Sequence, residues 1–468
     1  MSASGIRPGR RGRSVVTGLG VVAPTGIGAA RHWESVLSGK SGLGRITRFD
    51  PTGYPVRVAG EVPGFRAAEQ VPGRLVPQTD RFTHFALAAA EDALADAAAD
   101  PATLPEYEMA VVTASSSGGT EFGQHEMENL YQKGSSWVGA YQSIAWFYAA
   151  TTGQVSIRHG MRGPCGVICG EQAGGLDALG QSRRLLDTGS RLVLSGGTDA
   201  SLCPYGLVAQ LSTGRLSTED DPARAYLPFD AAASGFVPGE GGAILVVESA
   251  EAAHARGVPS YGELLGYAAG FDPAADAMTR PPVTDDATGS PTAHGATRSA
   301  TAHGVTRPPA PDRAAARPPA PGRTTVRHSV LVSVIRRALT DAGLAPGDVD
   351  MVFADACGTP AEDLAEARAL TEVFGPGGVP VTAPKTLTGR LYAGGAALDV
   401  ATALLALSAG VVPHTAGLGR PAPGCEIDLV LDRPRQTDPR TALVLARGHG
   451  GFTSALVVGA GDRDALRR

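Results

Sequence analysis

The stretch with the clearest chemical meaning covers residues 163–175, which read GPCGVICGEQAGG. The β-branched pair Val167 and Ile168 predicts a buried strand, the glycines predict a tight turn, and leucines from Leu176 onwards predict a helix. A side chain at such a turn points at the positive end of the helix dipole, where an anionic nucleophile is activated. The residue at this position is Gln172, whose carboxamide has no lone pair suited to acyl transfer. The sequence thus builds the position of a nucleophile and fills it with a residue that is not one.

Two segments recur in the same order along the chain and predict a duplicated α/β unit. The first is a helix that Asp80 is expected to cap, followed by a strand at 109–113 and a loop of small residues. Its counterpart is a helix at 329–343 with a similar strand and loop after it. A second pair of helix starts, 172–175 and 392–395, shares the letters AGG. Because strands alternate with helices, mostly parallel sheets covered by helices are expected.

Composition excludes several classes of protein. The chain has 468 residues, of which 43% are hydrophobic and 19% are charged, as in an ordinary globular protein. A net charge of −5 gives no reason to expect nucleic acid or an anionic membrane surface as a partner. No run of about 18 apolar residues predicts a membrane span. We therefore expect a cytoplasmic protein.

The cysteines favour the same compartment. They are odd in number and lack paired CxxC spacing, so we expect buried reduced thiols and neither disulfides nor a metal site. No cofactor is predicted. The five cysteines are Cys165, Cys169, Cys203, Cys357 and Cys425.

The chain divides into segments of different composition. A low-complexity segment carries TAHGATR and TAHGVTR, with His294 and His303 nine residues apart, a poor metal site. It lacks apolar side chains for a core and is predicted to be a disordered insertion rich in Pro, Ala, Thr and Arg. The expected boundaries are a disordered basic tail at 1–13, an N-terminal half at 14–260, the insertion at 281–328, and a C-terminal half made of 261–280 and 329–468.

Several motifs resemble those of β-ketoacyl synthases of the thiolase fold. The motifs are GP at 163–164, the turn at Gln172, PFD at 228–230, VPGEGG at 237–242, GTP at 358–360 with Asp363 and Glu366, and PK at 384–385 with Gly389. The chain is similar in particular to the chain length factor, the ketosynthase-β subunit of type II aromatic polyketide synthases. The motifs for this are SIRHGMRGP at 156–164, EQAGG at 171–175 and KTLTGRLY at 385–392. The resemblance implies a thiolase-like α/β fold with a duplicated unit in five layers (αβαβα).

The resemblance also implies that the condensation chemistry has been lost. An active member has a cysteine where this chain has Gln172, and histidines where it has Asp355 and Arg390. The cysteine carries the acyl chain as a thioester. The imidazoles stabilise the enolate oxygen formed when malonyl loses carbon dioxide, a contribution on the order of a few kcal/mol. A carboxylate at Asp355 would repel that developing charge.

Other residues of the family site are retained, namely Lys385, Asp363 and Glu366. A pairing of Lys385 with Glu366, and one of Arg390 with Asp355, would hold the vacated site together. The scaffold is therefore expected to persist without its chemistry.

Three alternatives remain open. Gln172 could decarboxylate malonyl groups on a carrier protein, since some related loading ketosynthases carry Gln at this position, although these retain the histidines. Cys169 is either a displaced nucleophile of an unorthodox condensing enzyme or, as we favour, a thiol facing the core from its strand. The third alternative is a homodimeric acyl-binding scaffold. We expect Cys357 to serve packing, and His449, in a loop where the family often has an aromatic gate, to be structural.

The resemblance implies that the chain acts by shaping a substrate tunnel. In this family the β subunit pairs with a catalytic ketosynthase-α, an acyl carrier protein serves the complex, and the growing poly-β-ketone extends into a tunnel at the interface. Motif matching places Thr120, Gly123 and Met127 at gating positions, on one helical face. None is a bulky aromatic, so a relatively long chain is predicted, with ordinary interface packing as the alternative. The predicted partner surface is the set of aromatic residues Trp137, Tyr141, Trp146, Phe147 and Tyr148.

Overall fold

The computed structural model describes residues 12–272 and 329–462. The insertion predicted at 281–328, with His294 and His303, lies outside these residues, as does most of the tail predicted at 1–13. No helix within the described residues has the length and apolar character needed to cross a membrane.

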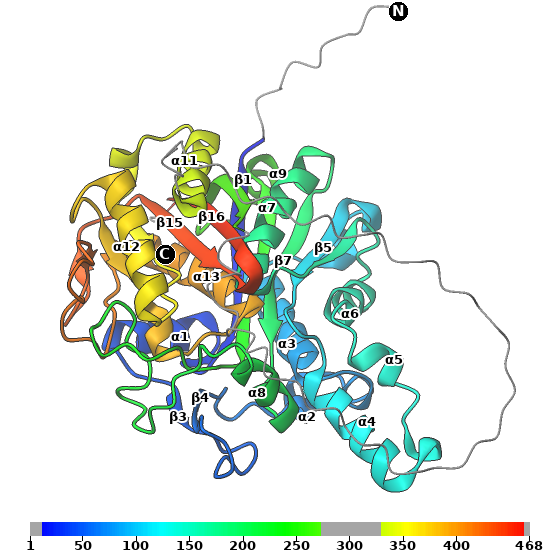
Figure 1. The fold of residues 1–468 in the computed structure, drawn as a ribbon. Coiled ribbons are helices and arrows are strands. Elements are labelled where there is room, and N and C mark those ends of the chain that lie inside the picture. The colour runs from blue at the N-terminus through cyan, green and yellow to red at the C-terminus, as the bar shows by residue number, and fades with distance from the viewer. Residues whose placement is uncertain (1–11, 273–328, 463–468) are drawn as a thin grey trace, which may run out of the picture.

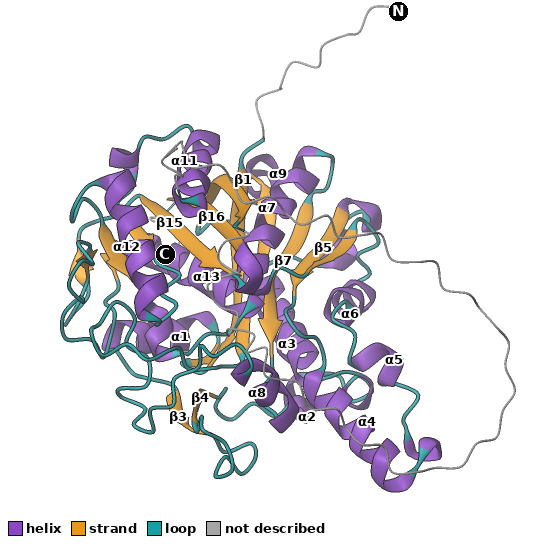
Figure 2. Ribbon diagram, viewed as in Figure 1, coloured by secondary structure: helices purple, strands orange, loops and turns teal. Residues whose placement is uncertain are grey.

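A mixed sheet runs through the molecule, and it contains two units with the same strand order (Figures 1 and 2). Along the order β1-β8-β7-β5-β6, two antiparallel pairings are followed by two parallel ones. The order β9-β16-β15-β10-β11 repeats this series. The first unit comprises β1 (Ser14–Ala23), β8 (Gly241–Ser249), β7 (Leu192–Asp199), β5 (Met109–Ala114) and β6 (Cys165–Ile168). The second comprises β9 (Gly262–Phe271), β16 (Phe452–Ala460), β15 (Thr441–Arg447), β10 (Met351–Phe353) and β11 (Pro380–Thr382), with β13 (Asp428–Leu429) beyond it. The predicted duplication is thus visible in the sheet.

The expectation of mostly parallel sheets is wrong, because half of the pairings within each unit are antiparallel. In the second unit the cause is the short connection at residues 448–451 between β15 and β16, which is long enough for a hairpin and too short for a crossover helix. The two units join where β1 meets β9 in an antiparallel pairing of Val15 with Glu263 and of Val16 with Gly262.

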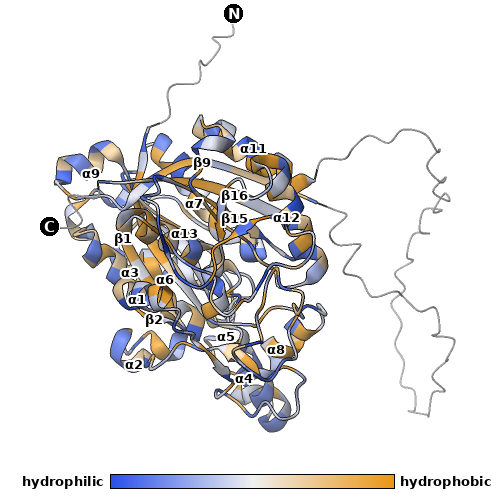
Figure 3. Ribbon diagram, turned by 90° about the vertical axis from the view of Figure 1, so that its left-hand side faces the viewer, coloured by the Kyte–Doolittle hydropathy of each residue, from blue (hydrophilic) through white to orange (hydrophobic). Residues whose placement is uncertain are grey.

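Helices lie on both sides of each unit and give the predicted five layers. Helices α7 (Gly174–Asp187) and α13 (Ala393–Ala409) pack against each other between the units, and α13 contacts strands of both. Helix α13 is mostly apolar and buried along nearly its whole length, as a helix enclosed between two sheets requires, and Figure 3 shows hydrophobic colour in central strands such as β16. The outer layers are α3 (Arg81–Asp96) and α6 (Ala150–His159) on the first unit, and α11 (Val330–Ala342) and α12 (Pro360–Phe374) on the second.

One pair of helices projects from this body. Helix α4 (Thr120–Lys133) and the short α5 (Gln142–Ala145) lie at the end of the molecule away from α12 (Figure 1). The carboxylate of Asp80 caps α3 as predicted, accepting from Phe82 N at 3.1 Å, and also accepts from Phe122 N in the first turn of α4 at 2.8 Å. One buried side chain therefore fixes the start of α4 to the core. The remaining elements are α1 (Ala29–Ser38), α2 (Ala67–Gln70), α8 (Pro204–Leu211), α9 (Ala250–Arg256), β2 (Gly26–Ile27), β3 (Leu43–Arg45), β4 (Val58–Gly60), β12 (Val411–Val412) and β14 (Arg435–Gln436).

Candidate functional site

The predicted strand, turn and helix around Gln172 are present. Strand β6 ends at Ile168, a single 3₁₀ turn (Glu171–Ala173) follows, and α7 begins at Gly174. The expectation of a buried strand is wrong, since β6 is the edge strand of the sheet and its residues are half-buried or exposed. Glu171 has a φ of 50°, a left-handed conformation that a residue other than glycine adopts at a cost. This strained turn directs Gln172 into the interior, where it is fully buried.

The amide of Gln172 has no polar neighbour to bond with. Within the described part of the chain, neither Nε2 nor Oε1 has a hydrogen-bond partner. Gly395 on α13 lies so close that a Cβ on it would be 3.0 Å from Nε2. A buried polar group without a partner costs roughly 1–3 kcal/mol. Gln172 therefore packs against α13 without a hydrogen bond from the described residues that would orient its amide.

The carboxylate of Glu171 occupies a point on which two backbone donors converge. Its Oε2 accepts from Gln172 N at 2.8 Å and from His449 N at 2.9 Å. Paired backbone N–H groups are the arrangement with which acyl-transfer enzymes stabilise an oxyanion. Here a resident carboxylate already satisfies both donors. The side chain of His449 is itself exposed, so this residue contributes its backbone.

Asp355 lies at the centre of a buried ion cluster. Its Oδ1 is 3.0 Å from Arg390 Nη2, which confirms the predicted pair, and its Oδ2 is 3.2 Å from Arg447 Nε. Burial raises the pKa of this carboxyl, but the charges of Arg390, Arg447 and Lys385 outweigh burial and lower the pKa to about 2. The carboxylate therefore stays ionised.

Arg447 was not predicted as a site residue. It ends β15, and besides Asp355 its guanidinium pairs with Glu366 at 2.9 Å and donates to the Glu362 carbonyl at 3.2 Å. The available signal in the sequence was an arginine that ends an otherwise apolar strand directly before the loop GHGG.

The predicted pairing of Lys385 with Glu366 is wrong. Lys385 Nζ forms an ion pair with Asp399 on α13 at 2.8 Å and donates to the carbonyl oxygens of Ala354 and Asp355. Glu366 is occupied elsewhere, because its two oxygens accept from the backbone N–H groups of Asp355 and Ala356 and from Arg447. The cluster therefore contains three cations and three carboxylates, a balance that buried charges require. These are Lys385, Arg390 and Arg447 with Asp355, Glu366 and Asp399.

Asp363 holds loops together. Its carboxylate accepts from Phe229 N and from Gly358 N, each at 2.9 Å. Burial raises its pKa to about 7, although these backbone donors act in the opposite direction. The geometry gives Asp363 a structural role.

The cysteines are only partly as expected. Cys203, Cys357 and Cys425 are buried, but Cys165 and Cys169 are exposed. Cys169 does not face the core because β6 ends one residue before it. Burial of part of its thiol and the nearby charge of Asp199 raise its pKa, the opposite of what a nucleophile needs.

Cys357 is a protonated donor. Its Sγ donates to Glu362 Oε2 at 2.9 Å, and burial raises its pKa. Residues 12–272 and 329–462 contain no group of three or more His, Cys, Asp and Glu side chains placed to hold a metal ion.

The three residues expected to gate a tunnel all lie on α4. Thr120 is buried at its N-terminus, Gly123 is half-buried, and Met127 is 39% exposed. A Cβ on Gly123 would lie 3.8 Å from the Cβ of Trp146, an ordinary contact distance. This face of α4 therefore runs from the core to the surface, and a larger side chain at its middle position would meet the neighbouring aromatic residue.

The aromatic residues expected to face a partner are indeed on the surface. With Met127, Leu130 and Tyr131 of α4, which are also exposed, they concentrate large exposed apolar side chains, here called the apolar patch, in residues 127–148. Their exposure ranges from 39% to 61% in the series Trp137, Tyr141, Trp146, Phe147 and Tyr148.

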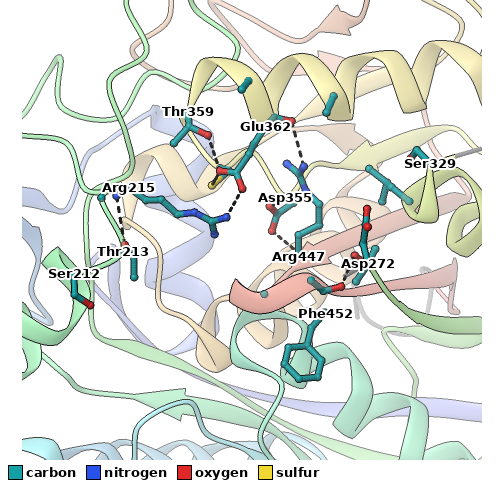
Figure 4. Close-up of a pocket in the computed structure, with 18 of the residues that line it drawn as sticks. Ser212, Thr213, Arg215, Asp272, Ser329, Asp355, Thr359, Glu362, Arg447 and Phe452 are labelled. Carbon is teal, nitrogen blue, oxygen red and sulfur yellow. Dashed lines mark hydrogen bonds and ion pairs between the residues drawn. The ribbon is translucent and has the colours of Figure 1, made fainter. Parts of the chain in front are cut away.

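A pocket of about 570 Å³ opens between residues 211–215 of the N-terminal half and residues of the C-terminal half, among them Glu362 and Phe452 (Figure 4). Figure 4 shows the guanidinium of Arg215 directed at Glu362, and Arg447 extending beside Asp355 towards α12. Phe452 stands at the pocket, and Asp355, Cys357 and Gly448 belong to its lining. Gln172 does not line it.

Comparison with known proteins identifies the family to which the chain belongs. Residues 13–253 match the family described as "Beta-ketoacyl synthase, N-terminal domain", and residues 318–419 match "Beta-ketoacyl synthase, C-terminal domain". The chain belongs to the β-ketoacyl synthase family.

Two curated members of this family match over nearly their whole length. The tetracenomycin polyketide synthase ketoacyl synthase beta subunit of Streptomyces glaucescens is 55% identical over 95% of this chain and 97% of its own. The actinorhodin polyketide putative beta-ketoacyl synthase 2 of Streptomyces coelicolor is 51% identical over 95% of this chain and 98% of its own. These relatives confirm the predicted resemblance to ketosynthase-β subunits.

Solved structures agree with the fold. The ishigamide ketosynthase/chain length factor has a TM-score of 0.80 at 25% identity, covering 96% of this chain and 100% of the other. A type II polyketide synthase ketosynthase in complex with its acyl carrier protein has a TM-score of 0.77 at 25% identity, with the same coverage. The thiolase-like fold of β-ketoacyl synthases is thereby confirmed.

Proposed function

We propose that this chain is a non-catalytic chain length factor. It pairs with a catalytic ketosynthase-α of a type II polyketide synthase and shapes the interface tunnel that limits the growth of the poly-β-ketone. The complex receives its substrate from an acyl carrier protein. The similarity to a ketosynthase beta subunit over 95% of the chain supports this assignment.

One observation carries the non-catalytic part of the proposal. The positions at which the family places a nucleophile and two histidines hold Gln172, Asp355 and Arg390, and the last two form a buried ion pair 3.0 Å long. No group there can become a thiolate or donate a proton near neutral pH. What the chain contributes to the complex is therefore the shape of its surface, including the exposed face of α4.

The decisive experiment uses the purified chain without a ketosynthase. Incubated with a malonyl-loaded acyl carrier protein, it should release no carbon dioxide above the level of the carrier alone. Release that disappears in Gln172→Ala would overturn the proposal in favour of a decarboxylase. Release that instead disappears in Cys169→Ser would favour an unorthodox condensing enzyme.

Co-purification tests the pairing. Expressed with a ketosynthase that retains the cysteine and both histidines, the chain should elute as a heterodimer and support polyketide formation. A stable homodimer that does not exchange with the ketosynthase would contradict the proposal and favour an acyl-binding scaffold. We place the complex in the cytoplasm, in keeping with five free cysteines.

A further inference from the structure

The pocket of Figure 4 leads towards the position that the family uses for chemistry, and its lining is charged there. Asp355 is 1% exposed and Arg447 is mostly buried, yet both belong to the lining. Arg447 contacts the carboxylates of Asp355 and Glu366 and the carbonyl of Glu362, so its guanidinium is held from three sides.

Arg390 lies behind these two charged lining residues. It is 3% exposed and does not line the pocket. Its Nη2 donates to Asp355 Oδ1 at 3.0 Å and to the carbonyl oxygen of Arg447 at 2.5 Å. Its Nη1 donates to the carbonyl oxygen of Asp355 at 3.3 Å. Arg390 therefore ties the two charged lining residues to each other.

A series of contacts continues from Arg447 to the turn that carries Gln172. Gly448, the next residue after Arg447, packs so tightly that a Cβ on it would lie 2.6 Å from the carbonyl oxygen of Gly170. The Glu171 carboxylate then links His449 N to Gln172 N. These contacts run without interruption from the lining of the pocket to Gln172, which has no exposed surface.

We propose that Asp355, Arg390 and Arg447 form an ionic barrier that ends the surface pocket before it reaches Gln172. A reactive group carried into this pocket would then stop at a charged wall. The inference rests on the proposed function. It adds a second reason for the absence of catalysis, because Gln172 would be inaccessible as well as chemically inert.

Chemical labelling of an introduced thiol tests the barrier. In the full chain carrying Gln172→Cys, the new thiol should react with iodoacetamide roughly 100-fold more slowly than the exposed Cys169, as quantified by peptide mass spectrometry. Adding Arg390→Ala should raise its rate at least roughly tenfold, and Arg447→Ala should act in the same direction.

The chain supplies its own controls. Cys203 is buried outside the cluster, so its labelling must stay slow, which excludes global unfolding as the cause of any increase. Arg215→Ala removes the partner of Glu362 on the outer part of the pocket and should leave the rate at position 172 unchanged.

The outcomes separate the barrier from the proposed function. Labelling of the Gln172→Cys thiol within a few-fold of Cys169 would overturn the barrier, as would no increase in both arginine variants. Either result, without carbon dioxide release by the native chain, leaves the proposed function standing. Carbon dioxide release with slow labelling would overturn the proposed function alone.

Discussion

Gln172 combines two properties that rarely occur together, complete burial and an amide without a partner in the described residues. A catalytic side chain is normally oriented by hydrogen bonds, and a structural one normally satisfies its polar atoms. Gln172 does neither. Its position is explained by the space between α7 and α13, which a side chain of this size fills.

Replacing this amide by an apolar side chain of similar size should therefore stabilise the protein. We expect Gln172→Met to raise the free energy of unfolding by about 1–3 kcal/mol, measured by urea denaturation, because the uncompensated desolvation of the amide disappears. Gln172→Ala removes the same amide but leaves a cavity, and should be less stable than Gln172→Met. A methionine variant less stable than the native chain would show that the amide has a partner in solution.

Asp355 should make stability depend on pH in acid. Its pKa of about 2 in the folded chain lies below its ordinary value of 3.8, so its stabilising contribution is complete above about pH 4 and is lost as the pH falls towards 2. We expect Asp355→Asn to cost about 3–5 kcal/mol at pH 7, because two buried guanidinium groups lose a charged partner. Urea denaturation at pH 7, 5 and 3 should show this difference narrowing at pH 3.

The exposed ion pair of Asp220 with Arg57 provides the matched control. Asp220→Asn should change stability by less than about 1 kcal/mol, since exposed pairs are screened by water. An Asp355→Asn variant as mild as this control would contradict the assigned role of the cluster.

At the scale of elements, α4 is the segment whose shape the proposed function depends on. Asp80 fixes its first turn to α3, while its later turns are mostly exposed apart from the buried Glu126. A helix anchored at one end presents a defined face to whatever lies beside it. Substitutions on that face should change what it excludes without disturbing the core.

Gly123→Phe should shorten the polyketide made by the heterodimer. The new ring would grow beside Trp146, whose Cβ lies 3.8 Å from the position of a Cβ on Gly123, and would fill space that a growing chain could enter. Product mass, measured after co-expression with the partner ketosynthase, provides the test. His125→Phe adds the same ring to an exposed position two residues along the helix and should leave product length unchanged. Equal product lengths in both variants would argue that this face of α4 does not gate.

The sequence predicted these elements far better than their mutual contacts. The turn at Gln172 followed from its local motif, and the pair of Asp355 with Arg390 followed from the resemblance to β-ketoacyl synthases. Arg447 was missed because it reaches Asp355 only through the parallel register of β10 and β15, in which Phe353 lies opposite Val444. Sequence pattern does not give register between strands so far apart in the chain.

The same limitation explains the other errors. The partner of Lys385 is Asp399, and only the packing of α13 between the two sheets brings them together. Cys169 was assigned to a strand that ends one residue earlier, and strand ends are the least predictable part of an element.

At the scale of the whole molecule, the exposed apolar residues around α4 and α5 lie at the end of the body away from α12 (Figure 1), and residues of α12 line the pocket. Such a patch is costly in an isolated subunit and favours a permanent partner. The Lys133 ammonium lies 5.4 Å from the centre of the Trp137 ring and holds that ring in place.

Trp137→Ala should weaken the heterodimer. We expect the dissociation constant to rise roughly 5- to 30-fold, equivalent to about 1–2 kcal/mol, because large aromatic residues dominate interface energies. Isothermal titration calorimetry with the purified ketosynthase gives the value. Phe452→Ala removes another exposed ring, 41% exposed against 61% for Trp137, at the pocket and should leave the affinity unchanged. Equal losses in the two variants would place the interface elsewhere.

The balance of charges around Asp355 has an evolutionary consequence. A histidine at position 355 alone would remove the carboxylate with which both Arg390 and Arg447 pair, and a histidine at position 390 alone would remove one of the two arginine ion pairs of Asp355. Each single step costs a large part of the stability of an ordinary domain before any activity returns. Because these residues act as one coupled unit, their substitutions are strongly epistatic. Under the proposed function, a condensing site could therefore be regained only through several substitutions made together.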